Sequence, residues 1–274
     1  MPCAQNVEDG CRIYFEDEGG MRPPVVIHGG FLDSVPTLRQ LDIAKAINDE
    51  FRVIYVDHRG LGRSDKPHDP EAYAMPLRAK DAVAVLDELD IERAHFVGLS
   101  WGGRLCFGVG EHAPHRVLSL VIGGNQPYAW PDSPVTRIVT EGLQAARSQG
   151  MEALINAMEA HWDTRFPDAL RAHYLDNDPV ALEAAWTKAL DDGPIAENLA
   201  TWDMHCLIFL GNADVDFYDL ARRAANEIPN AEFFSEQAKD HIESHQSQGE
   251  SLIDAVLRTL HSDIEPAFHR RQHP

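Results

Sequence analysis

The run Gly98-Leu99-Ser100-Trp101-Gly102 has the residue types and the spacing of a nucleophilic serine turn. Residues His95–Leu99 predict a short strand before it, and residues 103–112 predict a helix after it. A sharp turn between a strand and a helix exposes the serine hydroxyl at the positive end of the helix, where a negatively charged oxygen is stabilised. The glycines leave room for this turn because they carry no Cβ. The run also fits a glycine-rich turn whose serine only caps the helix. The presence of an acid and a base that could act with the serine decides between the two interpretations.

The first partner that such a serine needs is an acid that orients the base. Asp214 follows the apolar run Leu207–Leu210 and the turn Gly211-Asn212-Ala213, which places it at the carboxyl end of a predicted strand. Asp216, two residues later, is the reserve choice. A helix cap is the alternative role for Asp214. We take Asp214 as the predicted acid.

The second partner is a histidine base. His241 follows the strand candidate Glu232–Phe234 and lies in a predicted loop before the C-terminal helix candidate Ser251–Leu260. His245, one helical turn later, competes for the role. Because His241 is nearer to the strand, it is the predicted base that takes the proton from Ser100.

Two backbone amides would complete a site that stabilises an oxyanion. The strand candidate Val25–His28 runs into Gly29, Gly30 and Phe31, and the two glycines keep the backbone accessible to a substrate oxygen. Gly30 is the predicted donor, with the adjacent Phe31 as the second choice. The other predicted donor is the amide of Trp101. An ordinary turn from strand to loop is the alternative interpretation of this segment.

Apolar runs that read as strands alternate with helical patterns along most of the chain. Several runs are continuously apolar, which is expected of parallel strands that are covered on both faces. Alternating strands and helices predict an α/β fold with a mainly parallel sheet. The strand candidates are Cys11–Glu16, Val25–His28, Arg52–Asp57, His95–Leu99, Val117–Ile122, Leu207–Leu210 and Glu232–Phe234.

Residues 127–203 break this alternation, because they contain helical patterns and no convincing strand. We expect this insertion to lie on the chemistry side of the sheet, over an apolar pocket. Its aromatic side chains are expected to pack its own core and to line that pocket, with Phe31, Trp130 and Trp162 in contact with substrate. The helix candidates are Thr136–Gln149, Met151–Trp162, Asp168–Leu175, Pro179–Leu190 and Pro194–Thr201.

The composition limits the partners of the 274-residue chain. Its net charge of −20 disfavours nucleic acid and anionic membranes, which repel an acidic surface. The four cysteines fit no metal-binding spacing and predict a reduced, cytoplasmic protein. The first residues lack the basic and apolar regions of a signal peptide, and no apolar run approaches membrane-spanning length. We expect a small-molecule substrate, while oligomeric state is not indicated.

Four segments together resemble the α/β-hydrolase superfamily, in particular its lidded, esterase-like branch, over residues 10–260. His28-Gly29-Gly30 resembles the family's oxyanion loop, and Gly98–Gly102 resembles its nucleophile turn. Asp57–Ser64 matches the D-x-R-G-x-G-x-S turn, which is mainly structural in this family, and Gly211–Asp214 resembles the acid turn. One position departs: Asp240 precedes the histidine where the family usually has glycine. An adjacent carboxylate would raise the pKa of His241.

The resemblance implies the α/β-hydrolase fold, with a mostly parallel eight-stranded sheet flanked by helices and a helical lid inserted after strand 6. The expected core domain comprises residues 1–126 and 204–262. The expected cap comprises residues 127–203, and residues 263–274 are expected to form a flexible tail.

The resemblance also implies a serine hydrolase that cleaves a small, largely apolar ester or lactone through an acyl-enzyme, without metal or cofactor. An aspartate in place of Ser100 would have suggested haloalkane or epoxide chemistry. A carbon–carbon bond hydrolase and a cofactor-free perhydrolase use similar triads, and both stay open. The alternative outside enzymes is a ligand-sensing, hydrolase-like protein.

Overall fold

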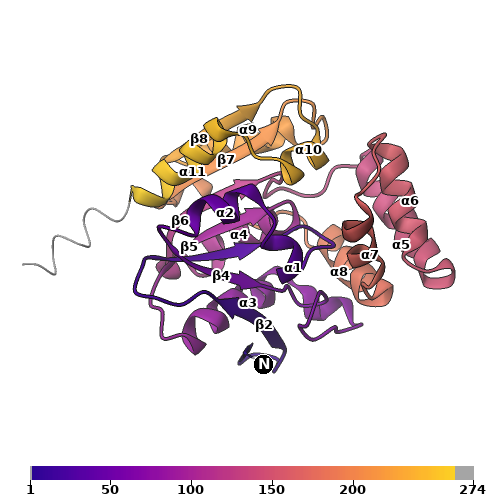
Figure 1. Cartoon of the computed structure of the whole chain (residues 1–274), viewed down its shortest axis with the longest axis horizontal. Coiled ribbons are helices and arrows are strands. Elements are labelled where there is room, and N and C mark those ends of the chain that lie inside the picture. The colour runs from indigo at the N-terminus through magenta and orange to yellow at the C-terminus, as the bar shows by residue number, and fades with distance from the viewer. Residues whose placement is uncertain (1, 263–274) are drawn as a thin grey trace, which may run out of the picture.

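An eight-stranded sheet forms the centre of the computed structural model, which describes residues 2–262 (Figure 1). The strand order is β1-β2-β4-β3-β5-β6-β7-β8, and every neighbouring pair from β4 to β8 is parallel. The predicted α/β architecture is therefore confirmed. The short first strand, which pairs antiparallel with β2, was not among the strand candidates. The strands are β1 Cys3–Gln5, β2 Arg12–Asp17, β3 Pro24–His28, β4 Arg52–Val56, β5 Ala94–Leu99, β6 Val117–Gly123, β7 His205–Gly211 and β8 Ala231–Glu236.

Helices cover both faces of the sheet because alternate residues of each central strand point to opposite sides. On one face, Val26, Phe96 and Ile122 pack against α3, α4 and α9. On the other face, Val25 and Val97 pack against α1, α2 and α11. The covering helices are α1 Val35–Leu38, α2 Asp42–Ile47, α3 Met75–Glu88, α4 Trp101–His112, α9 Tyr218–Glu227, α10 His241–Gln246 and α11 Glu250–His261, with 3-10 helices η1 Pro70–Tyr73 and η2 Pro114–Arg116.

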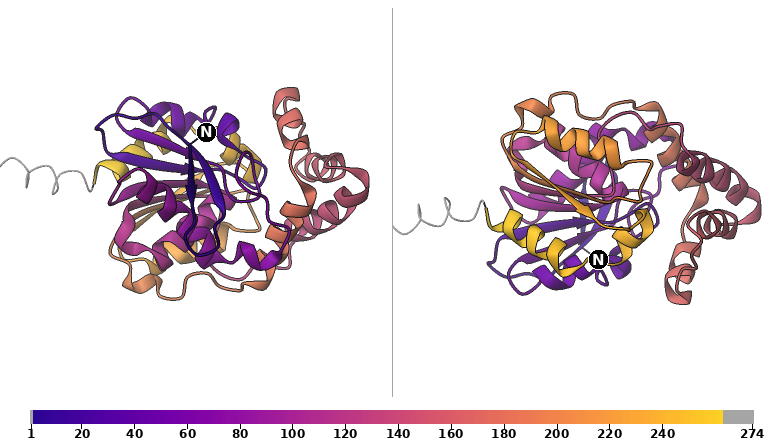
Figure 2. Two further views of the ribbon diagram at one scale, coloured as in Figure 1. Left: turned by 90° about the horizontal axis from the view of Figure 1, so that it is seen from below. Right: turned by 90° about the horizontal axis from the view of Figure 1, so that it is seen from above.

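Four helices between β6 and β7 form a separate layer beside the sheet (Figure 2). We call residues 127–203 the cap segment. Its helices share an apolar core with Leu32, Leu61 and Trp101 from the sheet side, so the segment packs onto the region that follows the strands. They are α5 Pro134–Gln149, α6 Glu152–His161, α7 Asp168–Leu175 and α8 Pro179–Asp191, followed by η3 Leu199–Thr201.

The helix predicted over Pro194–Thr201 is wrong, because only its last three residues form a 3-10 turn. The preceding residues are held in another way. The Ile195 amide donates to the Pro127 carbonyl at 2.8 Å, and the side chains of Ile195 and Ala196 are buried in the core beneath the sheet. Tertiary packing therefore outweighs the local helical preference here.

The C-terminal residues and the helix lengths bear on two further predictions. The predicted tail, residues 263–274, lies outside the described residues. Within residues 2–262, no helix has the length and the apolar character needed to span a bilayer.

Candidate active site

Ser100 occupies a sharp turn between β5 and α4. Its backbone lies at φ +52° and ψ −110°, a conformation that side-chain-bearing residues rarely adopt. A Cβ at Gly98 would collide with the Gly102 backbone, so the glycines do permit the turn. The Ser100 amide donates to the Gly123 carbonyl at 2.7 Å, and Asn125 Nδ2 donates to the Ser100 carbonyl at 3.0 Å. These bonds fix the residue from the end of the neighbouring strand β6 and from the segment that follows it.

Three of the predicted site residues lie in one hydrogen-bonded chain. Ser100 Oγ is 2.9 Å from His241 Nε2, and His241 Nδ1 is 2.8 Å from Asp214 Oδ2. Asp214 is buried after the end of β7, whereas the reserve candidate Asp216 makes no hydrogen bond to His241 within residues 2–262. This arrangement lets the imidazole accept the Ser100 proton while the carboxylate holds the ring and stabilises its charge.

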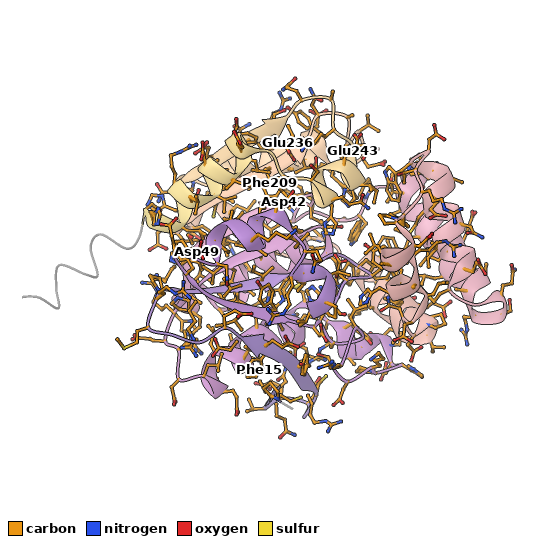
Figure 3. The ribbon with its side chains drawn as sticks, viewed as in Figure 1. Phe15, Asp42, Asp49, Phe209, Glu236 and Glu243 are labelled. Carbon is orange, nitrogen blue, oxygen red and sulfur yellow. The ribbon has the colours of Figure 1, made fainter. Side chains whose placement is uncertain are left out.

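His241 is the first residue of α10, whereas the sequence predicted a loop at this position. The carboxylate of Asp240 caps this helix by accepting the Glu243 amide at 2.9 Å, which explains why an acidic residue stands before the histidine. Helix α10 packs against β7, and Figure 3 shows labelled residues of both elements, Glu243 and Phe209, in the same part of the molecule.

The pKa of His241 is raised above its ordinary value of 6.5. Burial of the ring acts in the opposite direction, but the charge and the hydrogen bond of Asp214 outweigh it, with further contributions from Asp240 and Asp216. The histidine therefore holds a proton over a wider pH range than a free imidazole does.

With His241 as the base, we expect kcat/KM for an ester to rise with pH through an apparent pKa above 6.5, because only the neutral ring can accept the proton of Ser100. Asp214→Asn should move this limb to lower pH, since the substitution removes the negative charge that favours the imidazolium. A pH–rate profile of both proteins measures the shift. A wild-type limb at or below pH 6.5 would contradict the assignment.

A second histidine–carboxylate pair lies beside the first. His245 Nε2 is 2.8 Å from Asp33 Oδ2, and the same oxygen accepts the Gly30 amide at 2.8 Å. The other oxygen of Asp33 accepts the hydroxyls of Thr37 at 3.0 Å and Tyr174 at 3.3 Å. Although burial raises the pKa of Asp33, these partners, His245 foremost, lower it to about 2. His245 is thus engaged by Asp33 and does not contact Asp214.

The predicted oxyanion amides differ in whether they are free to bind a substrate oxygen. Trp101 is the first residue of α4, so its amide has no carbonyl partner within the helix. The Gly30 amide is bound to Asp33 in this conformation, and a substrate oxygen would have to compete for it. The adjacent Phe31 amide donates to no acceptor among residues 2–262. The role of Gly30 as a donor stays a prediction.

A small cavity of about 80 Å³ opens beside Ser100 and His241. Aromatic rings form a large part of its wall, and the three predicted substrate contacts, Phe31, Trp130 and Trp162, are among them. Trp162 stacks on the His241 ring with the ring centroids 6.1 Å apart. These rings make the cavity apolar around the polar atoms of the serine and the histidine.

Two buried arginines stand behind the indoles of this cavity. The Arg78 guanidinium lies 4.2 Å from the centroid of Trp101, and that of Arg104 lies 4.9 Å from Trp130. Burial lowers the pKa of Arg78 to about 10 and that of Arg104 to about 9. Neither forms a salt bridge within residues 2–262, so both add positive potential behind the aromatic wall.

Among the polar residues of this site, Asp33 and Asn125 were not predicted, whereas Tyr174 and Trp186 belong to the cap aromatics that were expected to pack the insertion or line the pocket. A local signal existed for Asp33, because an aspartate side chain can bond to the backbone three residues before it, which here is the Gly30 amide. The others come from segments whose proximity the sequence does not reveal. Among residues 2–262, no group of three or more histidine, cysteine, aspartate or glutamate side chains is arranged to hold a metal ion.

Comparison with known proteins identifies related chains. Bifunctional epoxide hydrolase 2 of Mus musculus is 33% identical over 144 residues, which cover 50% of this chain and only 26% of the mouse protein. The 3-oxoadipate enol-lactonase 1 of Acinetobacter baylyi is 24% identical over 255 residues, covering 90% of this chain and 86% of the relative. A carboxylesterase structure from the thaumarchaeon Nitrososphaera gargenis superimposes with a TM-score of 0.82 at 20% identity, over 97% of this chain and all of the other (100%).

The match to a family model is more extensive than the match to the mouse enzyme. Residues 23–218 fit the model described as alpha/beta hydrolase fold, a range that includes Ser100 and Asp214 together with the intervening cap segment. The strand order and the flanking helices agree with that description. The chain belongs to the α/β-hydrolase fold family.

Proposed function

We propose that this protein is a serine hydrolase that cleaves a small, largely apolar ester or lactone through an acyl-enzyme intermediate. The observation that carries the proposal is the hydrogen-bonded chain from Ser100 through His241 to Asp214 at the edge of an aromatic cavity. The relatives named as enol-lactonase and carboxylesterase support this substrate class. The epoxide hydrolase relative does not extend its named activity to this chain, because a serine stands at the nucleophile position.

The reaction has two halves, and in each of them His241 takes up one proton and gives it back. Ser100 Oγ attacks the carbonyl carbon as His241 Nε2 takes its proton, and the carbonyl oxygen becomes an oxyanion near the Trp101 amide. His241 then returns the proton to the leaving alcohol, which leaves an ester between Ser100 and the acyl group. In the second half, His241 takes a proton from water, and the resulting attack releases the acid and restores Ser100.

The test is intact-mass analysis after treatment with a fluorophosphonate, which forms a covalent adduct with an activated serine. We expect one adduct on the wild-type protein, located on the peptide containing Ser100, and none on Ser100→Ala. Hydrolysis of short p-nitrophenyl esters should be lost in the same variant. A folded wild-type protein that forms no adduct and hydrolyses no ester would refute the proposal and favour the ligand-sensing alternative.

A further inference from the structure

The cavity beside Ser100 is too small for a whole ester of ordinary size. Its volume is about 80 Å³, which is about half of the roughly 150 Å³ of an engineered apolar cavity that binds benzene. A short acyl group fills it. The remainder of a larger substrate must therefore lie outside this cavity.

A second, larger cavity adjoins it between the cap segment and the core. It has a volume of about 520 Å³, within the size range of small-molecule sites. Helix α1 and the residues after it form one wall, with Pro36 and Leu41, and the opposite wall is α7, with Ala169 and Leu170. Because Pro36 and Ala169 are exposed, this outer cavity is open to solvent.

Three side chains line both cavities and separate them: Asp33, Tyr174 and His245. They come from the loop after β3, from α7 and from α10, and Asp33 binds the other two at 3.3 Å and 2.8 Å. The side chains of these three shared residues are joined to one another by hydrogen bonds. A substrate that spans both cavities has to pass these side chains.

The position of the group that protonates the leaving oxygen decides which half of the ester lies in the outer cavity. The leaving oxygen must receive its proton from His241 Nε2, so it lies on the side of α10. His245 stands one turn further along the same helix, and residues four apart share a helix face. A chain attached to the leaving oxygen therefore continues past His245 and into the outer cavity, which His245 and Gln246 line.

The lining also indicates the character of this group. Apolar side chains of Leu41, Pro167 and Leu170 alternate with the polar side chains of Gln40 and Gln246. The lining contains no lysine, arginine or glutamate, and the carboxylate of Asp33 is held by four donors. Its two histidines are engaged as well, His245 by Asp33 and His173 by the Ser34 hydroxyl. The cavity therefore suits an uncharged group with both apolar and hydrogen-bonding atoms.

We propose that the cavity between α1, α7 and α10 is the subsite for the alcohol half of the substrate, an uncharged alcohol of medium length, while the aromatic cavity takes a short acyl group. The proposal rests on the proposed esterase function. It makes the alcohol half the main determinant of specificity.

The test compares kcat/KM for acetates of ethanol, butanol, hexanol and octanol. In the wild-type protein we expect kcat/KM to rise about tenfold or more from ethyl to hexyl acetate, because the added methylenes become buried. Leu170→Trp and Ala169→Trp each place an indole in the outer cavity, and the ratio of the hexyl to the ethyl value should fall to about two. Because Ala169 is exposed, Ala169→Trp is not expected to disturb folding, and a lower ratio in this variant reports the filled cavity.

The matched control is Leu175→Trp, which lies on the same helix at an exposed position outside the lining. It should retain the wild-type ratio. Fluorophosphonate labelling of Ser100 in every variant separates the two proposals. Suppose that the proteins are labelled but kcat/KM does not depend on the length of the alcohol, or depends on it equally in the wild type and in the two tryptophan variants. Either result would overturn the subsite proposal alone. A wild-type protein without labelling or turnover would overturn both proposals.

Discussion

His241→Ala is expected to reduce kcat/KM for a short ester by about 10³-fold or more, because the variant leaves Ser100 without a base. His245→Gln should cost only about tenfold, since His245 meets no group that reacts. The two residues lie one helical turn apart, yet the structure gives them different partners. His241 joins Ser100 to Asp214, whereas His245 binds Asp33, whose carboxylate also holds the Gly30 amide.

The measurement is steady-state hydrolysis of p-nitrophenyl acetate by both variants, together with the rate of fluorophosphonate labelling. Labelling isolates the attack of Ser100, so His241→Ala should slow it by a comparable factor. Thermal unfolding of each variant serves as the control for a folding defect. Near-normal activity in His241→Ala combined with a large loss in His245→Gln would reverse the assignment, because the competing histidine would then be the base.

The sequence predicted those parts of the site that carry local signals. Ser100 and Asp214 each follow a buried apolar strand and stand in or after a recognisable turn, while His241 follows the partly exposed edge strand β8. The carboxyl ends of parallel strands meet at one edge of a sheet. Their proximity therefore follows from the α/β pattern. A local signal that His241 begins a helix was present but went unused: Asp240 and Glu243 have the spacing of a capping box, whereas the prediction placed His241 in a loop.

The contacts between the cap segment and the core were beyond the reach of the sequence. Tyr174 reaches Asp33 across 141 positions of the chain, and His173 lies 3.1 Å from Ser34 Oγ. Asn177 Nδ2 donates to the Leu32 carbonyl at 3.1 Å. Such pairings depend on how α7 docks onto the loop after β3, which periodicity does not specify. For this reason the sequence indicated an apolar pocket and gave neither its volume nor the outer cavity.

These contacts also connect the cap segment to the chemistry. The loop from Gly29 to Ser34 carries the predicted oxyanion amides of Gly30 and Phe31. Helix α7 contacts Asp33 and Ser34 of that loop, and Asn177, just after α7, binds the Leu32 carbonyl. A displacement of α7 would therefore shift the amides as well as the wall of the cavity. Substrate selection by the cap segment and stabilisation of the oxyanion are expected to vary together.

The largest expected effect on stability lies away from Ser100, at the motif Asp57–Ser64. Its Arg59 is only 1% exposed and forms a two-point ion pair with Asp81 of α3, with both N···O distances 2.6 Å. A third nitrogen–oxygen contact of 2.7 Å joins Arg59 to Asp9. The pair thus ties the loop after β4 to α3 and to the segment after β1. This network agrees with a structural role for the motif.

Asp81→Leu is expected to lower the free energy of unfolding by about 3–5 kcal/mol, because it leaves a buried guanidinium with only the half-buried Asp9 as a charged partner. Urea unfolding measures the loss. Replacing both partners, in Arg59→Met with Asp81→Leu, should recover most of it, since neither charge is then buried. Asp219→Asn removes the exposed pair with Arg222 and should change stability very little. An Asp81 variant no less stable than the Asp219 variant would show that the buried pair contributes nothing, and the motif would need another explanation.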